Sequence, residues 1–219
     1  MNVLGIVQLT QAAQGAGGYA YSFGIEQLAS SGRLRTPAQV SGLVEQLLLT
    51  SIAPADGIAS GIAFRAARHG SFDDLPSLCA LLSSNRLPTP MRLASLQMGQ
   101  RLWGLSRTWD WASPVHQQFD DLATRTDLHH AVAFGTLVSE TTSSQLRAIA
   151  TCLLNTAKSI IMTAIRAIPL DEATGEKILA ALQPTITQLA ASCADKSPSD
   201  IPPLNTHPDP EDPFRPLFP

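Results

Sequence analysis

Residues 143–168 read SSQLRAIATCLLNTAKSIIMTAIRAI, a run that contains neither proline nor glycine. Its apolar residues recur at intervals of three and four, which is the spacing that places side chains on one face of an α-helix. The positions on this face are Leu146, Ile149, Ala150, Leu153, Ala157, Ile160, Ile161, Ala164 and Ile168. A face this wide predicts a central buried helix, and Pro169 ends it.

Helical periodicity also dominates on both sides of this stretch. Thr36 followed by Pro37 is typical of a helix start, and Asp171 has the side chain of a helix N-cap. Ser71 to Asp74 resembles a capping box that begins another helix. Further helices are predicted over residues 21–30, 37–48, 55–69, 75–82, 91–109, 114–128 and 130–138. Residues 3–9 are compatible with either a strand or a helix. The sequence therefore predicts an all-α, single-domain multi-helix bundle.

Composition supports one folded unit and a tail. With 219 residues and 44% hydrophobic content, the chain is long enough for one sizeable core. Residues 195–219 hold five acidic and two basic residues, and this difference of −3 equals the net charge of the whole chain. They also hold eight prolines, which favour an extended chain. We expect an all-α domain over residues 1–194 and an acidic, Pro-rich tail over residues 195–219.

Two interpretations of this tail stay open. It is either a solvated disordered segment, or a segment that becomes ordered on a partner through Phe214, Leu217 and Phe218. The tail lacks the apolar periodicity of a core element. Truncation after Ser192 is therefore expected to leave the helical fold intact.

Several classes of partner and location are disfavoured. No Lys/Arg cluster is long enough to neutralise several phosphates, which argues against a nucleic-acid partner. The most apolar stretch is interrupted by Arg147, Asn155, Lys158 and Arg166, so no membrane-spanning helix is expected. The first residues lack the basic start of a signal peptide. A cytoplasmic location is expected.

Metal and disulfide chemistry find no support in the residue spacing. Cys79, Cys152 and Cys193 are odd in number and far apart, so they are predicted to be buried thiols. The histidines form no His-x-x-x-His pair. His129 and His130 begin an apolar helix, where they are expected to pack or to bond the backbone. No metal and no cofactor is expected.

A glycine-rich stretch, residues 15–26, reads GAGGYAYSFGIE. It lacks the Gly-Lys-Ser/Thr ending of a phosphate-binding loop, and no Gly-x-Ser-x-Gly elbow occurs in the chain. The stretch predicts a tight turn, with Gly17, Gly18 and Gly24 as turn residues, before a helix. On such a helix Ser22 and Glu26 share one face. With no nucleophile beside a base, we expect a non-enzymatic protein.

Four stretches, taken in order, resemble the urease accessory protein UreF family across about residues 4–192. They are GGYAYSFGIE at residues 17–26, MRLASLQMG at 91–99, HAVAFG at 130–135 and AIRAIPL at 164–170. The resemblance implies an all-α homodimer without enzymatic activity. It also implies a complex with UreD (also called UreH) and the GTPase UreG, which delivers nickel to apo-urease.

The candidate partner-binding residues lie on these stretches and on the tail. They are Tyr19, Tyr21, Ser22, Glu26, Arg92, Arg166, Arg215 and Phe218. Tyrosines beside polar groups suit an interface, although both tyrosines are equally compatible with a core position.

Departures from the family pattern are mostly polar. Lys158 stands where a glutamate is common, Glu176 replaces a glutamine, and Asp171 with Glu172 replaces Gly-Gln. Two other interpretations therefore stay open. One is a divergent α-helical adaptor for another GTPase or metalloenzyme, and the other is an enzyme, such as a small hydrolase, with a concealed site.

Overall fold

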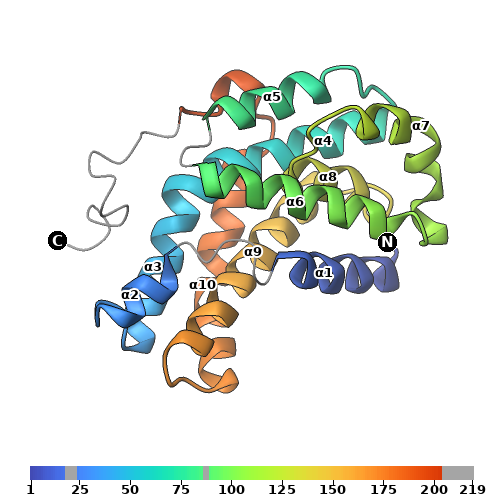
Figure 1. Ribbon diagram of the computed structural model, residues 1–219. Helices are drawn as coiled ribbons and strands as arrows, with labels where there is room; N and C mark the ends of the chain where they lie inside the picture. The colour runs from blue at the N-terminus through green and yellow to red at the C-terminus, as the bar shows by residue number, and fades with distance from the viewer. Residues whose placement is uncertain (18–23, 86–88, 204–219) are drawn as a thin grey trace.

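The computed structural model describes residues 1–17, 24–85 and 89–203, and within these ranges every regular element is helical (Figure 1). The predicted all-α class is therefore confirmed. The α-helices are α1 (Val3–Gly17), α2 (Ile25–Ser30), α3 (Pro37–Leu47), α4 (Ile58–His69), α5 (Leu75–Asn85), α6 (Thr89–Ser106), α7 (Ser113–Thr124), α8 (His130–Val138), α9 (Gln145–Ala167) and α10 (Glu172–Cys193). Shorter elements are the π-helix η1 (Leu48–Gly57) and the 3₁₀ turns η2 (Asp110–Ala112) and η3 (Pro198–Asp200).

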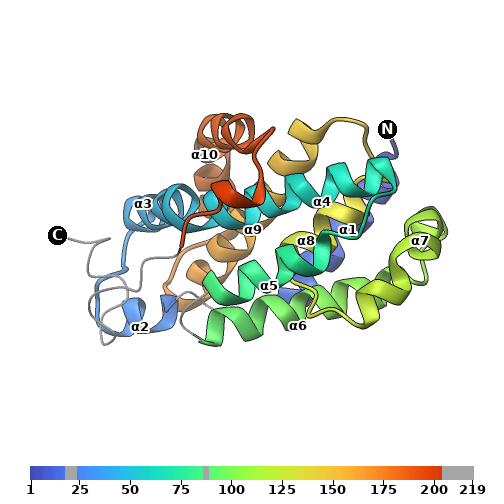
Figure 2. The same ribbon diagram turned by 90° about the horizontal axis from the view of Figure 1, so that it is seen from above.

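The short helix α8 occupies the centre of one half of the protein. All nine of its residues are buried, and it lies between α4 and α6 (Figure 2). The long helix α9 packs against α10, α4 and η1, and it also contacts α1 and α2. The prediction of a wide apolar face on α9 is confirmed for Ile149, Leu153 and Ile161, but Leu146 is exposed. The fully buried helix is α8 rather than α9.

Local side-chain chemistry sets where several helices begin. The Thr36 hydroxyl accepts a hydrogen bond from the Gln39 amide, and the Gln39 side chain accepts one from the Thr36 amide, which completes a capping box. The Asp171 carboxylate accepts from the Thr174 amide at 2.7 Å. These helix starts, and the bounds of α8, are as the sequence predicts.

The predicted break between residues 48 and 55 is wrong. Residues Pro37–His69 form one continuous helical stretch, in which η1 joins α3 to α4. Pro54 lies inside η1, where the Ile58 amide reaches back five residues to the Ala53 carbonyl. A proline removes one amide donor and crowds the preceding turn of an α-helix, and the wider π turns accommodate it without ending the helix.

Residues 3–9, which the sequence left open between a strand and a helix, belong to helix α1. Other helix boundaries differ from the sequence prediction. Helix α2 begins at Ile25, later than residue 21, because Gly24 has a left-handed φ of 70° just before it. Helix α6 ends at Ser106, and Trp109 leads into η2 instead.

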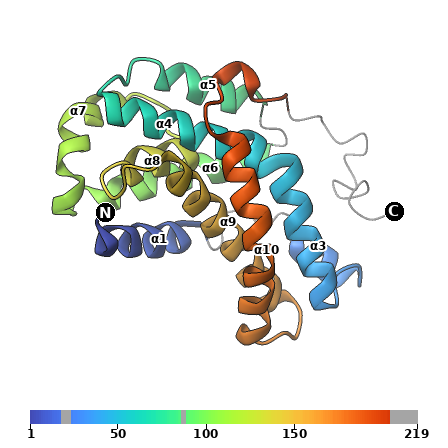
Figure 3. The ribbon, with the colours of Figure 1, turned by 180° about the vertical axis from the view of Figure 1, so that it is seen from behind.

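Residues 194–203, which we call the strap, fold back beside α4 after α10 ends (Figure 3). Ile201 of the strap is buried, and the Arg65 guanidinium donates to the Lys196 carbonyl. The Ser197 hydroxyl and amide both bond the Asp200 carboxylate. The core thus extends to Ile201, which argues against the expectation that truncation after Ser192 leaves the fold intact. The predicted domain boundary itself stays a prediction.

Two helical stretches, Pro37–His69 and Gln145–Ala167, are long and apolar enough to cross a membrane by length and composition alone. In their most apolar windows, 67% and 50% of the residues are buried inside the protein, as is usual for core helices.

The three cysteines are buried thiols, as predicted. Burial raises the pKa of Cys79 to about 11 and also raises the pKa of Cys193. The Cys193 thiol donates to the Ala53 carbonyl within η1 at 3.2 Å. These thiols therefore act as packing groups.

Candidate partner-binding surface

The second and third stretches of the family resemblance meet in one buried junction. His129, directly before α8, is fully buried, and its Nδ1 lies 2.9 Å from the Ser95 hydroxyl on α6. Its Nε2 lies 3.0 Å from the Ser83 hydroxyl on α5. A Cβ added at Gly99 would lie 2.1 Å from the Leu128 carbonyl oxygen, so α6 approaches this segment at the distance that only glycine permits. These residues hold three elements together rather than forming a surface.

A second close approach fixes α8 against α4. A Cβ added at Gly135 would lie 2.2 Å from the Ser60 carbonyl oxygen. Gly135 is the last residue of the stretch at 130–135, so this stretch also serves packing. The prediction that His129 packs at a helix start is confirmed, and its two ring nitrogens lie beside two serine hydroxyls.

The first stretch contributes an exposed carboxylate next to α9. Ile25 and Leu28 are buried where α2 packs against α9, and Glu26 between them is exposed. Gly17 is the last residue of α1, and Gly24 directly precedes α2. Gly18, Tyr19, Tyr21 and Ser22 lie outside the described residues, and so does the predicted helix face that joins Ser22 to Glu26.

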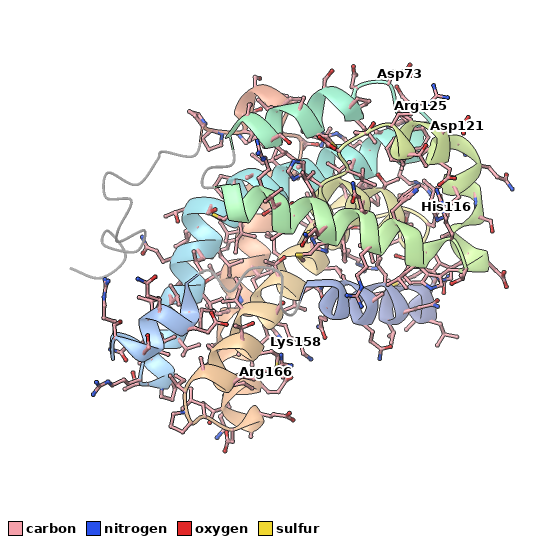
Figure 4. The ribbon with its side chains drawn as sticks, viewed as in Figure 1. Asp73, His116, Asp121, Arg125, Lys158 and Arg166 are labelled. Atoms are coloured by element: carbon pink, nitrogen blue, oxygen red, sulfur yellow. The ribbon has the colours of Figure 1, made fainter. Side chains whose placement is uncertain are left out.

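The fourth stretch places charge on the same end of the protein. Ala164 and Ile165 are buried, whereas Arg166 is exposed. Figure 4 shows Lys158 and Arg166 on the lower half of α9, on the side of the molecule where α2 lies. The Lys158 ammonium lies 3.3 Å from a Glu176 carboxylate oxygen on α10. Two departures from the family pattern therefore pair with each other.

Among the predicted partner-binding residues, the structure brings Glu26 and Arg166 onto two helices that pack together. Arg92 is half-buried near the start of α6, whose main packing partners are α8 and α1. Arg215 and Phe218 lie outside the described residues. We use the name α2–α9 end for the charged side chains of Glu26 on α2, Lys158 and Arg166 on α9, and Glu176 on α10.

A polar cluster between α6 and α7 was not predicted from the sequence. The Asp120 carboxylate accepts from Trp103 Nε1 at 2.9 Å and from the Arg107 guanidinium at 2.9 and 3.0 Å. His116 Nε2 lies 3.0 Å from the Ser106 hydroxyl, and its Nδ1 lies 3.5 Å from Asp120 Oδ1. The spacing of four between His116 and Asp120 is the one signal in the sequence that indicates their contact.

Burial lowers the pKa of His116, and the Asp120 carboxylate only partly offsets that effect. Burial alone would raise the pKa of Asp120, but the hydrogen bonds from Trp103 and Arg107 outweigh it and hold this pKa below its usual value. The cluster thus has a neutral imidazole beside an ionised carboxylate at neutral pH. The Asp120 carboxylate, the Trp103 indole and His116 Nε2 are paired within the protein, which fits a structural role, whereas the buried His116 Nδ1 has no hydrogen-bond partner among the described residues.

No group of three or more His, Cys, Asp or Glu side chains that could hold a metal ion occurs in the described ranges.

Comparison with known proteins identifies the family. The UreF family model matches residues 34–183, which are 150 of the 219 residues of the chain. The chain belongs to the UreF family. This match includes the α6–α8 junction, all of α9 and about half of α10, but it begins after the glycine-rich stretch.

Curated relatives extend the similarity to most of the chain. The UreF of Kocuria rhizophila is 25% identical over 193 residues, which cover 87% of this chain and 80% of the relative. The UreF of a Nostoc species is 27% identical over 189 residues, covering 84% and 79%. The UreF of Paenarthrobacter aurescens is 28% identical over 178 residues, covering 80% and 77%. Each of these relatives is described as a urease accessory protein.

Proposed function

We propose that this chain is a urease accessory protein that takes part in the maturation of urease. The observation that carries this conclusion is the match to the UreF family over residues 34–183, together with relatives that are named urease accessory proteins. Proteins of this family are accessory factors and not catalysts.

In this role the chain acts as a docking platform in the cytoplasm. It joins a UreD/UreH homologue and the GTPase UreG to apo-urease, modulates the GTPase during nickel insertion, and works as a homodimer. The platform is a single-domain helical bundle, and its Pro-rich tail contributes Arg215 and Phe218 to a partner. Tyr19, Tyr21 and Ser22 contribute to the same assembly beside Glu26.

The charges of the α2–α9 end support this role. Glu26 and Arg166 are exposed on packed helices, so their positions are set before a partner arrives. The side chains of Lys158 and Glu176 are 37% and 63% exposed. An ion pair that is this exposed to solvent contributes at most about 1 kcal/mol to stability. Charged groups on a rigid surface orient a partner and raise its association rate.

The test is activation of urease in cells whose own UreF gene is deleted. This chain is supplied with its UreD and UreG homologues, and urease activity and urease-bound nickel are measured. We expect both to be restored by the wild-type chain, reduced by Arg166→Ala, and unaffected by Arg101→Ala, which alters an exposed arginine on α6. Full activation without the chain would contradict the proposal. A folded chain that fails to bind the UreD homologue and binds another GTPase would instead favour the divergent adaptor.

A further inference from the structure

Helix α7, residues Ser113–Thr124, is joined to the rest of the bundle by a small set of side chains, and we call it the α7 arm. Figure 1 shows it at the edge of the molecule, and its main packing partner is the short turn η2. Phe119 on its inner face stacks on Phe72 with ring centroids 5.0 Å apart, and it meets Trp103 in a T-shaped contact at 5.3 Å. An element with so few attachments can open while the rest of the fold stays intact.

Two side chains of the arm make polar links to α6 and the residue after it. The Asp120 carboxylate accepts from Trp103 Nε1 and from the Arg107 guanidinium. The His116 ring packs against Trp103 with centroids 4.4 Å apart, and its Nε2 lies 3.0 Å from the Ser106 hydroxyl. The polar attachment of the arm to α6 therefore depends on one carboxylate and one imidazole.

The hydrogen bonds of Ser106 determine the tautomer of His116. A serine hydroxyl has a single proton, and Ser106 donates it to the Trp103 carbonyl at 2.8 Å. The contact between the same hydroxyl oxygen and His116 Nε2 therefore requires the ring proton to be on Nε2. In the neutral ring Nδ1 is then unprotonated, and this buried atom has no hydrogen-bond partner among the described residues. It lies 3.5 Å from Asp120 Oδ1.

Protonation of Nδ1 changes which helix Asp120 binds. The new N–H group would face the Asp120 carboxylate, which lies four residues along the same helix. Oδ1 of this carboxylate already accepts from Trp103 and from two nitrogens of Arg107. The imidazolium thus competes with the donors on the α6 side, and a bond within α7 replaces bonds between α7 and α6.

Burial acts in the same direction. The His116 side chain is 12% exposed, and this burial lowers its pKa although the Asp120 carboxylate acts to raise it. The Arg107 guanidinium also lowers the pKa, because it repels a second positive charge. An open arm hydrates the imidazolium and removes both penalties, so acid favours the open form. Other charged side chains around the arm are exposed to solvent, namely Asp73, Asp74, Asp110, Asp121 and Arg125 (Figure 4).

We propose that His116 is an acid-sensitive latch that releases the α7 arm from α6. The arm is closed at neutral pH, and it opens as the pH falls below 6.5 and through the lower pKa of the closed form. The opening is local, because η2 stays attached to α1 through Trp111 Nε1 and the Gln8 side chain, 2.8 Å apart. It uncovers the rings of Phe119 and Trp103, so that an apolar surface becomes available in acid alone. The inference concerns the chain itself and does not depend on the proposed function.

Hydrogen–deuterium exchange of the full chain, read by mass spectrometry at pH 7.5 and pH 5.0, tests the latch. After correction for the intrinsic effect of pH on exchange, we expect the protection of amides in residues 113–124 to fall about threefold to tenfold at the lower pH. Protection in α8 and α9 should stay unchanged. Tryptophan emission should shift to longer wavelength, and it reports this region alone because the three tryptophans are residues 103, 109 and 111.

Three variants separate the latch from a general effect of acid. His116→Gln does not titrate, and its arm should stay protected at both pH values. His69→Gln is the matched control, because this histidine is exposed at the end of α4, and it should behave as the wild-type chain does. Asp120→Asn removes the ion pair with Arg107, so its arm should already be less protected at pH 7.5.

Each outcome bears on the proposal. Circular dichroism melting first confirms that the variants are folded. A loss of protection that includes α8 and α9 would mean that acid unfolds the whole chain, and it overturns a local opening. An equal loss in the wild-type chain and in His116→Gln overturns the role of the imidazole. If His116→Gln does not fold, full protection of the arm in Asp120→Asn at pH 7.5 overturns the latch by itself.

Discussion

Gly99 shows how one missing side chain fixes the position of two helices. An added Cβ would lie 2.1 Å from the Leu128 carbonyl oxygen and 2.8 Å from the His130 amide nitrogen, and neither backbone atom can move aside as a flexible side chain would. We expect Gly99→Ala to lower the free energy of unfolding by about 1–3 kcal/mol, the usual cost of overpacking a core. Urea denaturation of the purified chain measures this change.

Gly104 provides the matched control on the same helix. It is exposed, and an added Cβ would meet no atom within 4 Å. Since alanine favours helix over glycine by about 1 kcal/mol, Gly104→Ala should stabilise the protein slightly. A similar destabilisation by both variants would mean that alanine destabilises α6 at either position. The close approach at Gly99 would then not be the cause of the loss in stability.

His116 makes stability depend on pH in a predictable direction. Burial lowers its pKa in the folded state from the usual value of 6.5, so protonation favours the unfolded chain. The contribution of neutral His116 to folding stability is therefore fully present above pH 6.5, and it is lost as the pH falls through the pKa of His116 in the folded state. Asp120, whose pKa is also lowered, adds a loss of the same sign below its usual 3.8.

His116→Gln tests this dependence because glutamine can keep a hydrogen bond to Ser106 but does not titrate. We expect the fall in melting temperature between pH 7 and pH 5 to be smaller in the variant than in the wild-type chain. Equal falls in the two proteins would show that His116 does not contribute to the acid sensitivity.

At the scale of elements, the sequence predicted the features that neighbouring residues determine, such as where a helix begins and ends. The bounds of α8 and the caps at Thr36 and Asp171 follow from residues within a few positions of each helix end. Thiol burial was predictable because cysteine packs as a small hydrophobe. The continuous helix Pro37–His69 was not predictable, because a proline such as Pro54 usually ends a helix, whereas here it lies within π turns that pack against α9 and α10.

The strap was missed for a related reason. A single buried residue, Ile201, has no periodic partners in the sequence, and the prolines around it favour an extended tail. Its burial depends on α4, which lies more than one hundred residues earlier in the chain. The prediction for Leu146 was wrong in the opposite sense, because it was expected to be buried and is exposed. It fits the apolar period of α9 but lies beyond the part of that helix that the bundle covers.

The strap is expected to contribute measurably to stability. Ile201→Ala removes a buried side chain and should lower the free energy of unfolding by about 2 kcal/mol, the lower end of the range for isoleucine. Truncation after Ala194 should cost at least as much, because it also removes the Lys196 carbonyl that Arg65 bonds. Truncation after Pro203 should leave the melting temperature unchanged. If the two truncated chains melt at the same temperature, the strap is not part of the core.

For the whole molecule, the resemblance indicated the family correctly but did not separate packing residues from surface residues. Ser95, Gly99 and Gly135 lie on resembling stretches, and each is held by a contact inside the bundle. Such contacts join residues far apart in sequence, so no local pattern reveals them. The placement of Glu26 beside α9 likewise depends on how α2 packs, which only the tertiary structure shows.

The Lys158–Glu176 pair offers a test of whether the α2–α9 end serves folding or partner binding. Lys158→Glu puts two carboxylates side by side, and the exchange Lys158→Glu with Glu176→Lys restores an ion pair of reversed polarity. Both side chains are partly exposed, so we expect the single variant to lose less than about 1 kcal/mol and the exchange to recover it. A partner that recognises the two charges at their original positions meets two negative charges in the single variant and reversed charges in the exchange. Urease activation should therefore be reduced by the exchange although stability is regained.

Full recovery of activation along with stability would assign the pair to folding alone, and the partner contacts would then have to lie elsewhere on the bundle.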